Sequence, residues 1–315
     1  MKTIIEMVRT TSRSLWTLVG VLLKTTTDEK PYKIHAGKNA IDIIQQNLGK
    51  EISHWSNVAL AKLGMFEAVY GKFNLAHKEE TELARKRLKY IDDFLDKMRK
   101  GIMDDKMPIS IFCNDDHMVF DHTVIKKTMH EEYYKSKKIS NIPPYEFTNK
   151  CAGQNFVALM MTTVPHTQDV LTICASSFRK WGNEHLKDWA DRGIEDIVSE
   201  DLDDILADSP ETSLFHELTH AEKYFGKDVM EDIKVDGEYA YQFALCERLG
   251  QAEVKKTDIG DNKALRNAES IDYFCAGVYL SQCNWRAGKC ERLSPEDNGE
   301  MNQDEVNAMM AEMGF

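Results

Sequence analysis

Apolar side chains at helical spacing mark the first third of the chain. From Asn39 to Lys100, Ile, Leu, Trp and Phe recur at the spacing of one helix face, and a long helix is expected within this region from Glu79 to Met98. Charges of both signs alternate along KEETELARKRLKYIDDFLDK, which is typical of a solvated helix face. The pattern therefore predicts a helical N-terminal part.

The pattern changes between Pro108 and Phe178. Short apolar runs, ISIF, FVALMM and DVLTIC, are separated by Asn, Asp, Pro and Gly, which predicts short strands and turns. The polar, proline-containing segment EEYYKSKKISNIPPYEF predicts an irregular loop.

Helical patterning returns at Ser209, which suits the N-cap of a helix with Pro210 at its first position. This helix is expected to end near Gly226, and two more are expected over Glu238–Leu249 and Lys263–Leu280. Together the elements predict an α+β fold, mainly helical with a small antiparallel sheet.

Composition narrows the class of protein. The chain has 315 residues, 42% of them hydrophobic and 29% charged, without a long flexible linker, so one elaborated domain is expected. A net charge of -12 and the lack of a concentrated basic face argue against nucleic acid as a partner. Protein or peptide substrates fit better, and the oligomeric state stays open.

The N-terminal region suggests export. The apolar run Leu15–Leu23 follows basic residues, as in a signal peptide, and is too short to cross a bilayer. No other segment reaches about 18 apolar residues, so no integral membrane segment is expected. We expect a secreted protein with a signal or propeptide over 1–35, a domain over 36–290 and a tail with a short helix over 291–315.

Seven cysteines are irregularly spaced and form no CxxC pair. This spacing disfavours a cysteine zinc site and a thioredoxin-type redox motif. Disulfides are expected in a secreted chain, with one thiol left over, and the nearby Cys283 and Cys290 are placed to close a short loop.

The motif His216-Glu217-Leu218-Thr219-His220 carries the chemistry of the chain. Two histidines four residues apart share one helix face, so both imidazoles can bind a single Zn²⁺. The glutamate between them suits a general base that takes a proton from water and delivers it to a leaving amine. The motif predicts one zinc ion per chain and hydrolysis of internal peptide bonds.

A catalytic zinc site needs a third protein ligand, which must come from downstream. The segment VDGEYAY supplies two carboxylates, Asp236 and Glu238, beside two phenols. The residues alone do not decide which of these two carboxylates is the third ligand.

HELTH, followed by GEYAYQFALCERL and KALRNAESIDYF, resembles the aspzincin metallopeptidases, a family that includes deuterolysin and the peptidyl-Lys metalloendopeptidases. The resemblance implies a zincin-like fold. In that family a GTxDxxYG motif follows the zinc helix, and this chain has Val235-Asp236-Gly237 in place of its leading Gly-Thr. By position, Glu238 falls on the zinc-binding aspartate and Tyr241 on the tyrosine that stabilises the oxyanion. Here Gln242 replaces the final glycine of the motif.

The same resemblance assigns further roles. Glu269 and Asp272 match acidic residues that line the pocket for the residue after the scissile bond, which implies a preference for Lys on the primed side. Likeness in KCAGQNFVALMMTTVPHTQDVLTICASSFRKW implies a disulfide between Cys151 and Cys174.

Two other interpretations stay open. A secreted, zinc-scavenging antigen-like protein would keep the metal helix without cleaving peptides, and a cytosolic scaffold would bind no stoichiometric metal. Zinc content separates the scaffold from the other two, and a peptide-cleavage assay with chelator separates the peptidase from the zinc carrier.

Overall fold

The computed structural model describes residues 32–104, 106–107, 109–112, 118–120, 133–136, 145–146, 151, 158–162, 169–174, 177 and 185–293. Its N-terminal part contains the helices α3 (Tyr32–Asn47), α4 (Asn57–Tyr70) and α5 (Lys78–Met103), with the 3-10 turn η1 (Ile52–His54) between the first two. The predicted helical N-terminal part is thus confirmed. Ser56 begins α4 as an N-cap, because its hydroxyl accepts a hydrogen bond from the amide of Ala59 at 3.2 Å.

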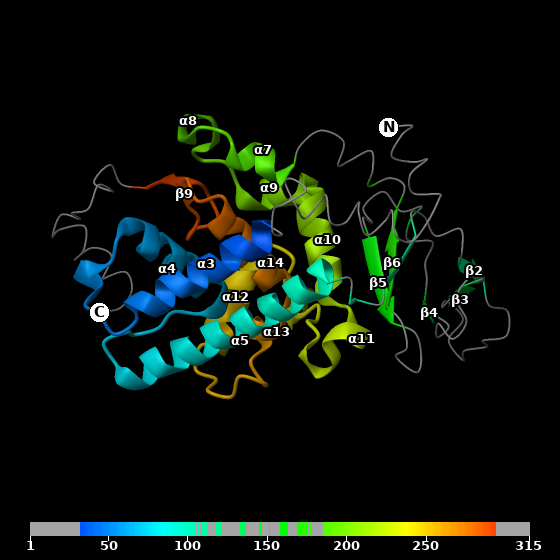
Figure 1. The fold of residues 1–315 in the computed structure, drawn as a ribbon, viewed down its shortest axis with the longest axis horizontal. Helices are drawn as coiled ribbons and strands as arrows, with labels where there is room; N and C mark the ends of the chain where they lie inside the picture. The colour runs from blue at the N-terminus through cyan, green and yellow to red at the C-terminus, as the bar shows by residue number, and fades with distance from the viewer. Residues whose placement is uncertain are drawn as a thin grey trace.

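The remaining helices follow the strands in sequence. They are α7 (Leu186–Ala190), α8 (Ile194–Ile197), α9 (Leu202–Asp208), α10 (Pro210–Thr219), α11 (Glu222–Phe225), the 3-10 turn η3 (Gly226–Asp228), α12 (Phe243–Glu253), α13 (Lys263–Arg266) and α14 (Ala268–Tyr279). In Figure 1 the long helices gather on one side of the molecule, and the strands labelled β2 to β6 lie beyond α10 on the other.

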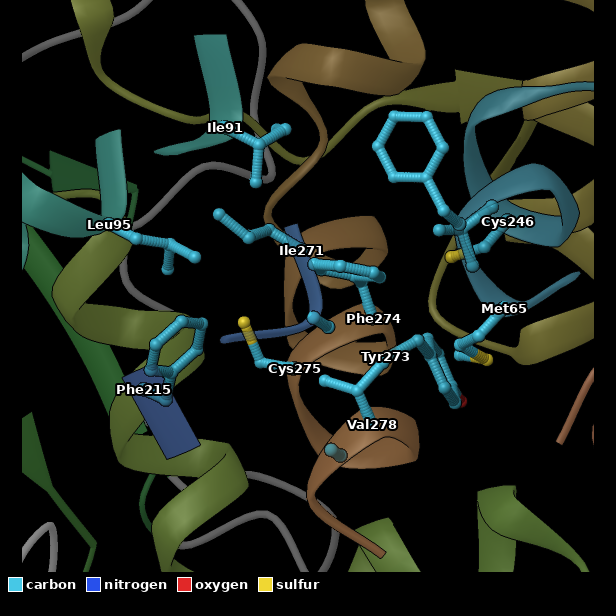
Figure 2. Close-up of a cluster of buried hydrophobic side chains, with 14 of the residues drawn as sticks. Met65, Ile91, Leu95, Phe215, Cys246, Ile271, Tyr273, Phe274, Cys275 and Val278 are labelled. Atoms are coloured by element: carbon cyan, nitrogen blue, oxygen red, sulfur yellow. The ribbon is translucent and has the colours of Figure 1, made fainter. Parts of the chain in front are cut away.

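Helix α14 is the centre of the helical region. Nearly every residue from Ala268 to Val278 except Glu269 is buried, which is the pattern of a helix surrounded by protein. It packs against α3, α4, α10 and α12. Figure 2 shows Ile271, Phe274 and Val278 on this helix among apolar side chains of its neighbours. Burial of this apolar surface is the main favourable term in folding.

Six strands lie among the described residues in the middle of the chain. The sheet beside α10 has the order β1 (Ile109–Phe112), β6 (Asp169–Ile173), β5 (Ala158–Thr162). The pair β1–β6 is parallel and the pair β5–β6 antiparallel. A second, antiparallel sheet has the order β2 (Met118–Phe120), β3 (Tyr133–Ser136), β4 (Tyr145–Glu146). The fold is therefore α+β, and one of its small sheets is mixed rather than purely antiparallel.

Two short hairpins complete the described strands. They are β7 (Lys234–Val235) with β8 (Glu238–Tyr239), and β9 (Cys283–Asn284) with β10 (Glu291–Arg292). The strands β3 and β4 lie within the segment expected to be an irregular loop, and β8 lies within the helix expected from Glu238. Both expectations were wrong at these positions, because strand pairing decides the local structure there.

Two expected helices are interrupted. The helix expected to run to Gly226 ends at Thr219, and α11 follows as a separate turn. The helix expected over Lys263–Leu280 breaks at Asn267, whose backbone is extended. Its buried side chain accepts a hydrogen bond from the amide of Ile233 at 3.1 Å. Asn267 therefore supports the segment before β7 instead of continuing the helix.

Among the described cysteines two disulfides are present, Cys151–Cys174 and Cys283–Cys290, as expected for both pairs. Cys246 and Cys275 are buried free thiols, so the expectation of a single thiol left over was wrong. Disulfides of this kind are compatible with secretion.

Helix α3 begins at Tyr32, before the expected domain boundary at residue 36. The proposed signal or propeptide falls almost entirely, and the C-terminal tail largely, outside the described residues. Among the helices that the structure describes, none combines the length and apolarity needed to cross a membrane.

Candidate metal centre

Helix α10 carries the HExxH motif at its C-terminal end. It begins as predicted, with Pro210 in its first turn and the Ser209 hydroxyl accepting from the amide of Thr212 at 3.4 Å. Leu214, Phe215 and Leu218 are fully buried and fix the helix against the core. The opposite face, with His216, turns toward the cleft.

Three donor atoms converge beside this helix. Nε2 of His216 and Nε2 of His220 lie 3.2 Å apart, and Oδ1 of Asp232 lies 3.3 Å from each of them. These residues form the one group among the described residues that has the composition and spacing to hold a metal ion. The sequence predicted the two histidines and missed Asp232.

The donor set fits zinc. A tetrahedral ion with bonds of about 2.0–2.1 Å holds its donors about 3.3 Å apart, close to the three separations found here. Two imidazoles and one carboxylate are a known ligand set of catalytic zinc sites, in which a fourth position stays free for water or substrate. The types of the three donor atoms and their separations therefore both agree with a zinc site.

The other ring nitrogen of each histidine lies close to an oxygen atom. Nδ1 of His216 lies 2.7 Å from Oε2 of Glu269, and Nδ1 of His220 lies 3.0 Å from the carbonyl oxygen of Met230. Such partners fix the tautomer and direct Nε2 toward the ion. Burial lowers the pKa of His216, but hydrogen bonds with Asp232 and Glu269 outweigh it and raise the pKa well above its ordinary value.

Backbone contacts hold Asp232 in place. The preceding residue, Glu231, forms a parallel bridge with Asn267, donating to the carbonyl of Arg266 at 2.8 Å. The following residue, Ile233, donates to the side chain of Asn267 at 3.1 Å. The burial of Asp232 raises its pKa, while hydrogen bonds with the two histidines lower it more, to a value far below its usual range.

The two carboxylates considered from the sequence lie elsewhere. Asp236 and Gly237 have positive φ angles of 53° and 91° and form the turn of the β7–β8 hairpin. Asp236 is exposed, and its Oδ2 lies 3.2 Å from Nη1 of Arg248. Glu238 pairs with Val235 in the hairpin and is exposed. The structure therefore brings Asp232, and not Glu238, to the two histidines.

Glu217 lies between the two histidines on the same turn of α10. Its Oε2 accepts a hydrogen bond from the amide of Met160 on β5 at 2.7 Å. Burial raises the pKa of Glu217, and the nearby His216 and His220 oppose this rise. An elevated pKa suits a group that must accept and then release a proton.

Tyr241 stands on the other side of the metal group. Its ring centroid is 5.9 Å from that of His216, at an angle of 71°, and its other neighbour is Tyr239, with stacked rings 5.2 Å apart. Burial and the charge of Asp232 raise the pKa of Tyr241. The phenol therefore stays protonated at neutral pH and keeps a hydrogen bond to donate.

The two acidic residues expected in a lysine pocket have internal partners. Asp272 is 2% exposed and forms an ion pair with the buried Lys33 of α3. The Lys33 ammonium also lies 4.7 Å from the ring centroid of Phe215. Glu269 faces His216, as described above. Burial raises the pKa of Asp272 to about 6, while Lys33 opposes the rise.

The three metal donors, Glu217, Tyr241, Glu269 and Asp272 line one cleft with a volume of about 1070 Å³. Its walls come from β5, α9, α10, the segment around Asp232, the two tyrosines and the start of α14. The described residues that line it include several acidic side chains but no Lys or Arg. The cleft therefore favours cationic ligands.

Comparison of this chain with protein-family models, curated proteins and solved structures gives no match, so the assignment of the centre rests on its residues and their geometry.

Proposed function

We propose that this protein is a zinc-dependent endopeptidase with a zincin-like α+β fold, which hydrolyses internal peptide bonds of protein or peptide substrates. The observation that carries the proposal is the triangle of donor atoms on His216, His220 and Asp232, with separations of 3.2–3.3 Å. Glu217 and Tyr241 flank this triangle in the same cleft.

Each residue has a distinct task. His216, His220 and Asp232 hold Zn²⁺, which supplies Lewis acidity that polarises the scissile carbonyl and makes water more acidic. Glu217 accepts the proton of the attacking water and returns it to the leaving amine. The Tyr241 hydroxyl donates a hydrogen bond to the oxygen on which negative charge develops. Met160 orients Glu217 through its amide.

Zinc content and peptide cleavage test the proposal together. We expect one zinc per chain and cleavage of a fluorogenic peptide that stops when a chelator is added. Glu217→Gln should keep the zinc and lower kcat by about 10²–10⁴-fold, because the proton acceptor is lost. Glu247→Gln makes the same chemical change at an exposed position on α12 and serves as the control.

The outcomes separate the alternatives. One zinc per chain without cleavage of any peptide would contradict the endopeptidase and support the non-catalytic zinc carrier. Lack of stoichiometric metal would contradict both. Full activity of Glu217→Gln would remove its assigned role as the base.

Preference for Lys on the primed side belongs to the same proposal, since Glu269 and Asp272 line the cleft. The ion pair of Asp272 with Lys33 already offsets one of the two charges, so we expect a moderate preference rather than strict selectivity. A peptide library read by mass spectrometry measures it, with Glu269→Gln as the variant that reduces the enrichment of Lys. A library without enrichment of basic residues at that position would contradict the preference.

A further inference from the structure

Residues 185–208, the acidic segment before α10, are rich in Asp and Glu. They include α7, α8 and α9, and α9 borders the cleft that contains the metal donors. Asp201 begins α9 as its N-cap, since its side chain accepts from the amide of Asp203 at 3.0 Å. Asp203, in the first turn of this helix, therefore has a fixed position at the cleft wall.

Asp203 reaches across to the segment that carries Tyr241. Its Oδ1 accepts from the amide of Phe243 at 2.9 Å and from the hydroxyl of Tyr273. The same hydroxyl lies 3.3 Å from the carbonyl oxygen of Tyr241. Tyr273 is 2% exposed, so this link runs through the interior of the protein.

These contacts replace a missing local cap. Phe243 is the first residue of α12, and the N-cap residue of this helix, Gln242, makes no side-chain capping bond. An uncapped amide at the start of a helix needs an acceptor from elsewhere, and a carboxylate there is also favoured by the helix dipole. Asp203 supplies that acceptor from α9.

Tyr241 depends on this support because its side chain has few contacts of its own. It is 44% exposed, and its ring contacts are with His216 and with Tyr239, which is itself 45% exposed. Its hydroxyl also forms a hydrogen bond with Asp232. The position of this hydroxyl therefore depends both on Asp232 and on the backbone on either side of Tyr241. A displacement of about 1 Å at a reacting group can cost about 10²-fold in rate.

We propose that Asp203 is a positioning residue for Tyr241, acting through Tyr273 and the start of α12. The inference rests on the proposed function only for the role of Tyr241 in catalysis. It assigns to the acidic segment before α10 the task of fixing the oxyanion-stabilising tyrosine beside the metal donors.

The first test compares two substitutions of Asp203. Asp203→Ala removes the oxygen that accepts both hydrogen bonds and should lower kcat about tenfold with little change in KM or zinc content. Asp203→Asn keeps an oxygen acceptor for Phe243 and Tyr273 and should recover most of the activity. Glu200→Gln, an exposed carboxylate of the same acidic segment, is the matched control. Equal loss of kcat in Asp203→Ala and Asp203→Asn would contradict a role in positioning.

A double substitution shows whether Asp203 acts through Tyr241. In a Tyr241→Phe background, Asp203→Ala should cause no further loss of kcat, because the group that it positions is already absent. A full tenfold loss in that background would overturn the proposal. If Asp203→Ala does not fold, Tyr273→Phe takes its place, since it breaks the link to Tyr241 and leaves the bond between Asp203 and Phe243 intact.

Amide exchange tests the same link without catalysis. In protein prepared without added metal, Asp203→Ala should accelerate hydrogen exchange over residues 241–245, while Asp203→Asn and Glu200→Gln should leave it unchanged. Unchanged exchange in Asp203→Ala would overturn the proposal. If the wild-type protein binds zinc but cleaves no peptide, the proposed function fails, and the exchange result still decides whether Asp203 fixes the Tyr241 segment.

Discussion

Phe274 at the centre of the helical region and Asp232 at the rim of the cleft are held by different forces. Phe274 is completely buried, with its ring 5.7 Å from Phe66 and 6.1 Å from Tyr70. The side chain of Asp232 is 34% exposed, and directional hydrogen bonds of the neighbouring backbone fix its position. Stability therefore resides mainly around α14, and the geometry of the metal donors depends on a few polar contacts.

This difference means that the two regions can be disrupted separately. Apolar burial is non-directional and roughly proportional to area, so its loss lowers the free energy of unfolding. Loss of one donor atom at the rim changes metal affinity while most of the core stays intact.

The largest effect is expected from Phe274→Ala. Removal of a buried ring should lower the free energy of unfolding by about 3–5 kcal/mol, because the cavity cannot close fully. Urea unfolding measures this loss, and Phe274→Leu should lose less. Zinc stoichiometry of the folded fraction should not change. A loss below about 1 kcal/mol would show that α14 is not the centre of stability.

Asp232→Ala should act on the metal instead. Removal of one of three donors should weaken zinc binding by more than about 100-fold, which exceeds the usual effect of changing an outer partner of a ligand. Competition with a chromogenic chelator measures the affinity. The matched controls are Asp236→Ala and Glu238→Ala, which should bind zinc as the wild type does. If Glu238→Ala lost as much zinc as Asp232→Ala, the result would support Glu238, the ligand expected from the sequence.

Glu67 gives the helical region a pH dependence. Burial raises the pKa of this α4 carboxyl from 4.5 to about 7, although the amide of Phe73 and nearby cations oppose the rise. Its raised pKa means that the folded state holds the proton more tightly than the unfolded state. The stability that this provides is complete below about pH 4.5 and is lost as the pH rises through about 7.

Urea unfolding at pH 5 and pH 8 checks this expectation. The wild type should lose about 2 kcal/mol more than Glu67→Gln between these two values, because Gln does not titrate. Glu247→Gln, at an exposed site, should follow the wild type. Parallel behaviour of Glu67→Gln and the wild type would contradict the shift.

Local patterns predicted much of the fold. The run ISIF is β1, and the N-cap of α10 at Ser209 follows from Ser-Pro spacing. Helix α5 also covers the whole of the predicted range from Glu79 to Met98 and continues to Met103. These elements are decided by neighbours in sequence, which periodicity and capping rules describe well.

The third metal donor could not be found in this way. Asp232 is selected by a bridge between Glu231 and Asn267, which are far apart in sequence. One local signal was available, since Asp-Gly between extended residues is a strong indicator of a two-residue hairpin turn. This signal predicts Asp236 in a turn and Glu238 on a strand. It therefore favours a carboxylate upstream of the hairpin, such as Asp232, as the third donor.

The end of α10 has one further consequence for the metal group. Thr219 is the last residue of the helix, and the carbonyl groups of Glu217, Leu218 and Thr219 accept hydrogen bonds from amides that lie beyond it, those of His220, Ala221 and Met230. The negative end of the helix dipole lies at His216 and His220 and attracts any cation held by these rings, by about 0.3–1 kcal/mol. The early stop thus adds the field of a helix terminus to the charge of Asp232.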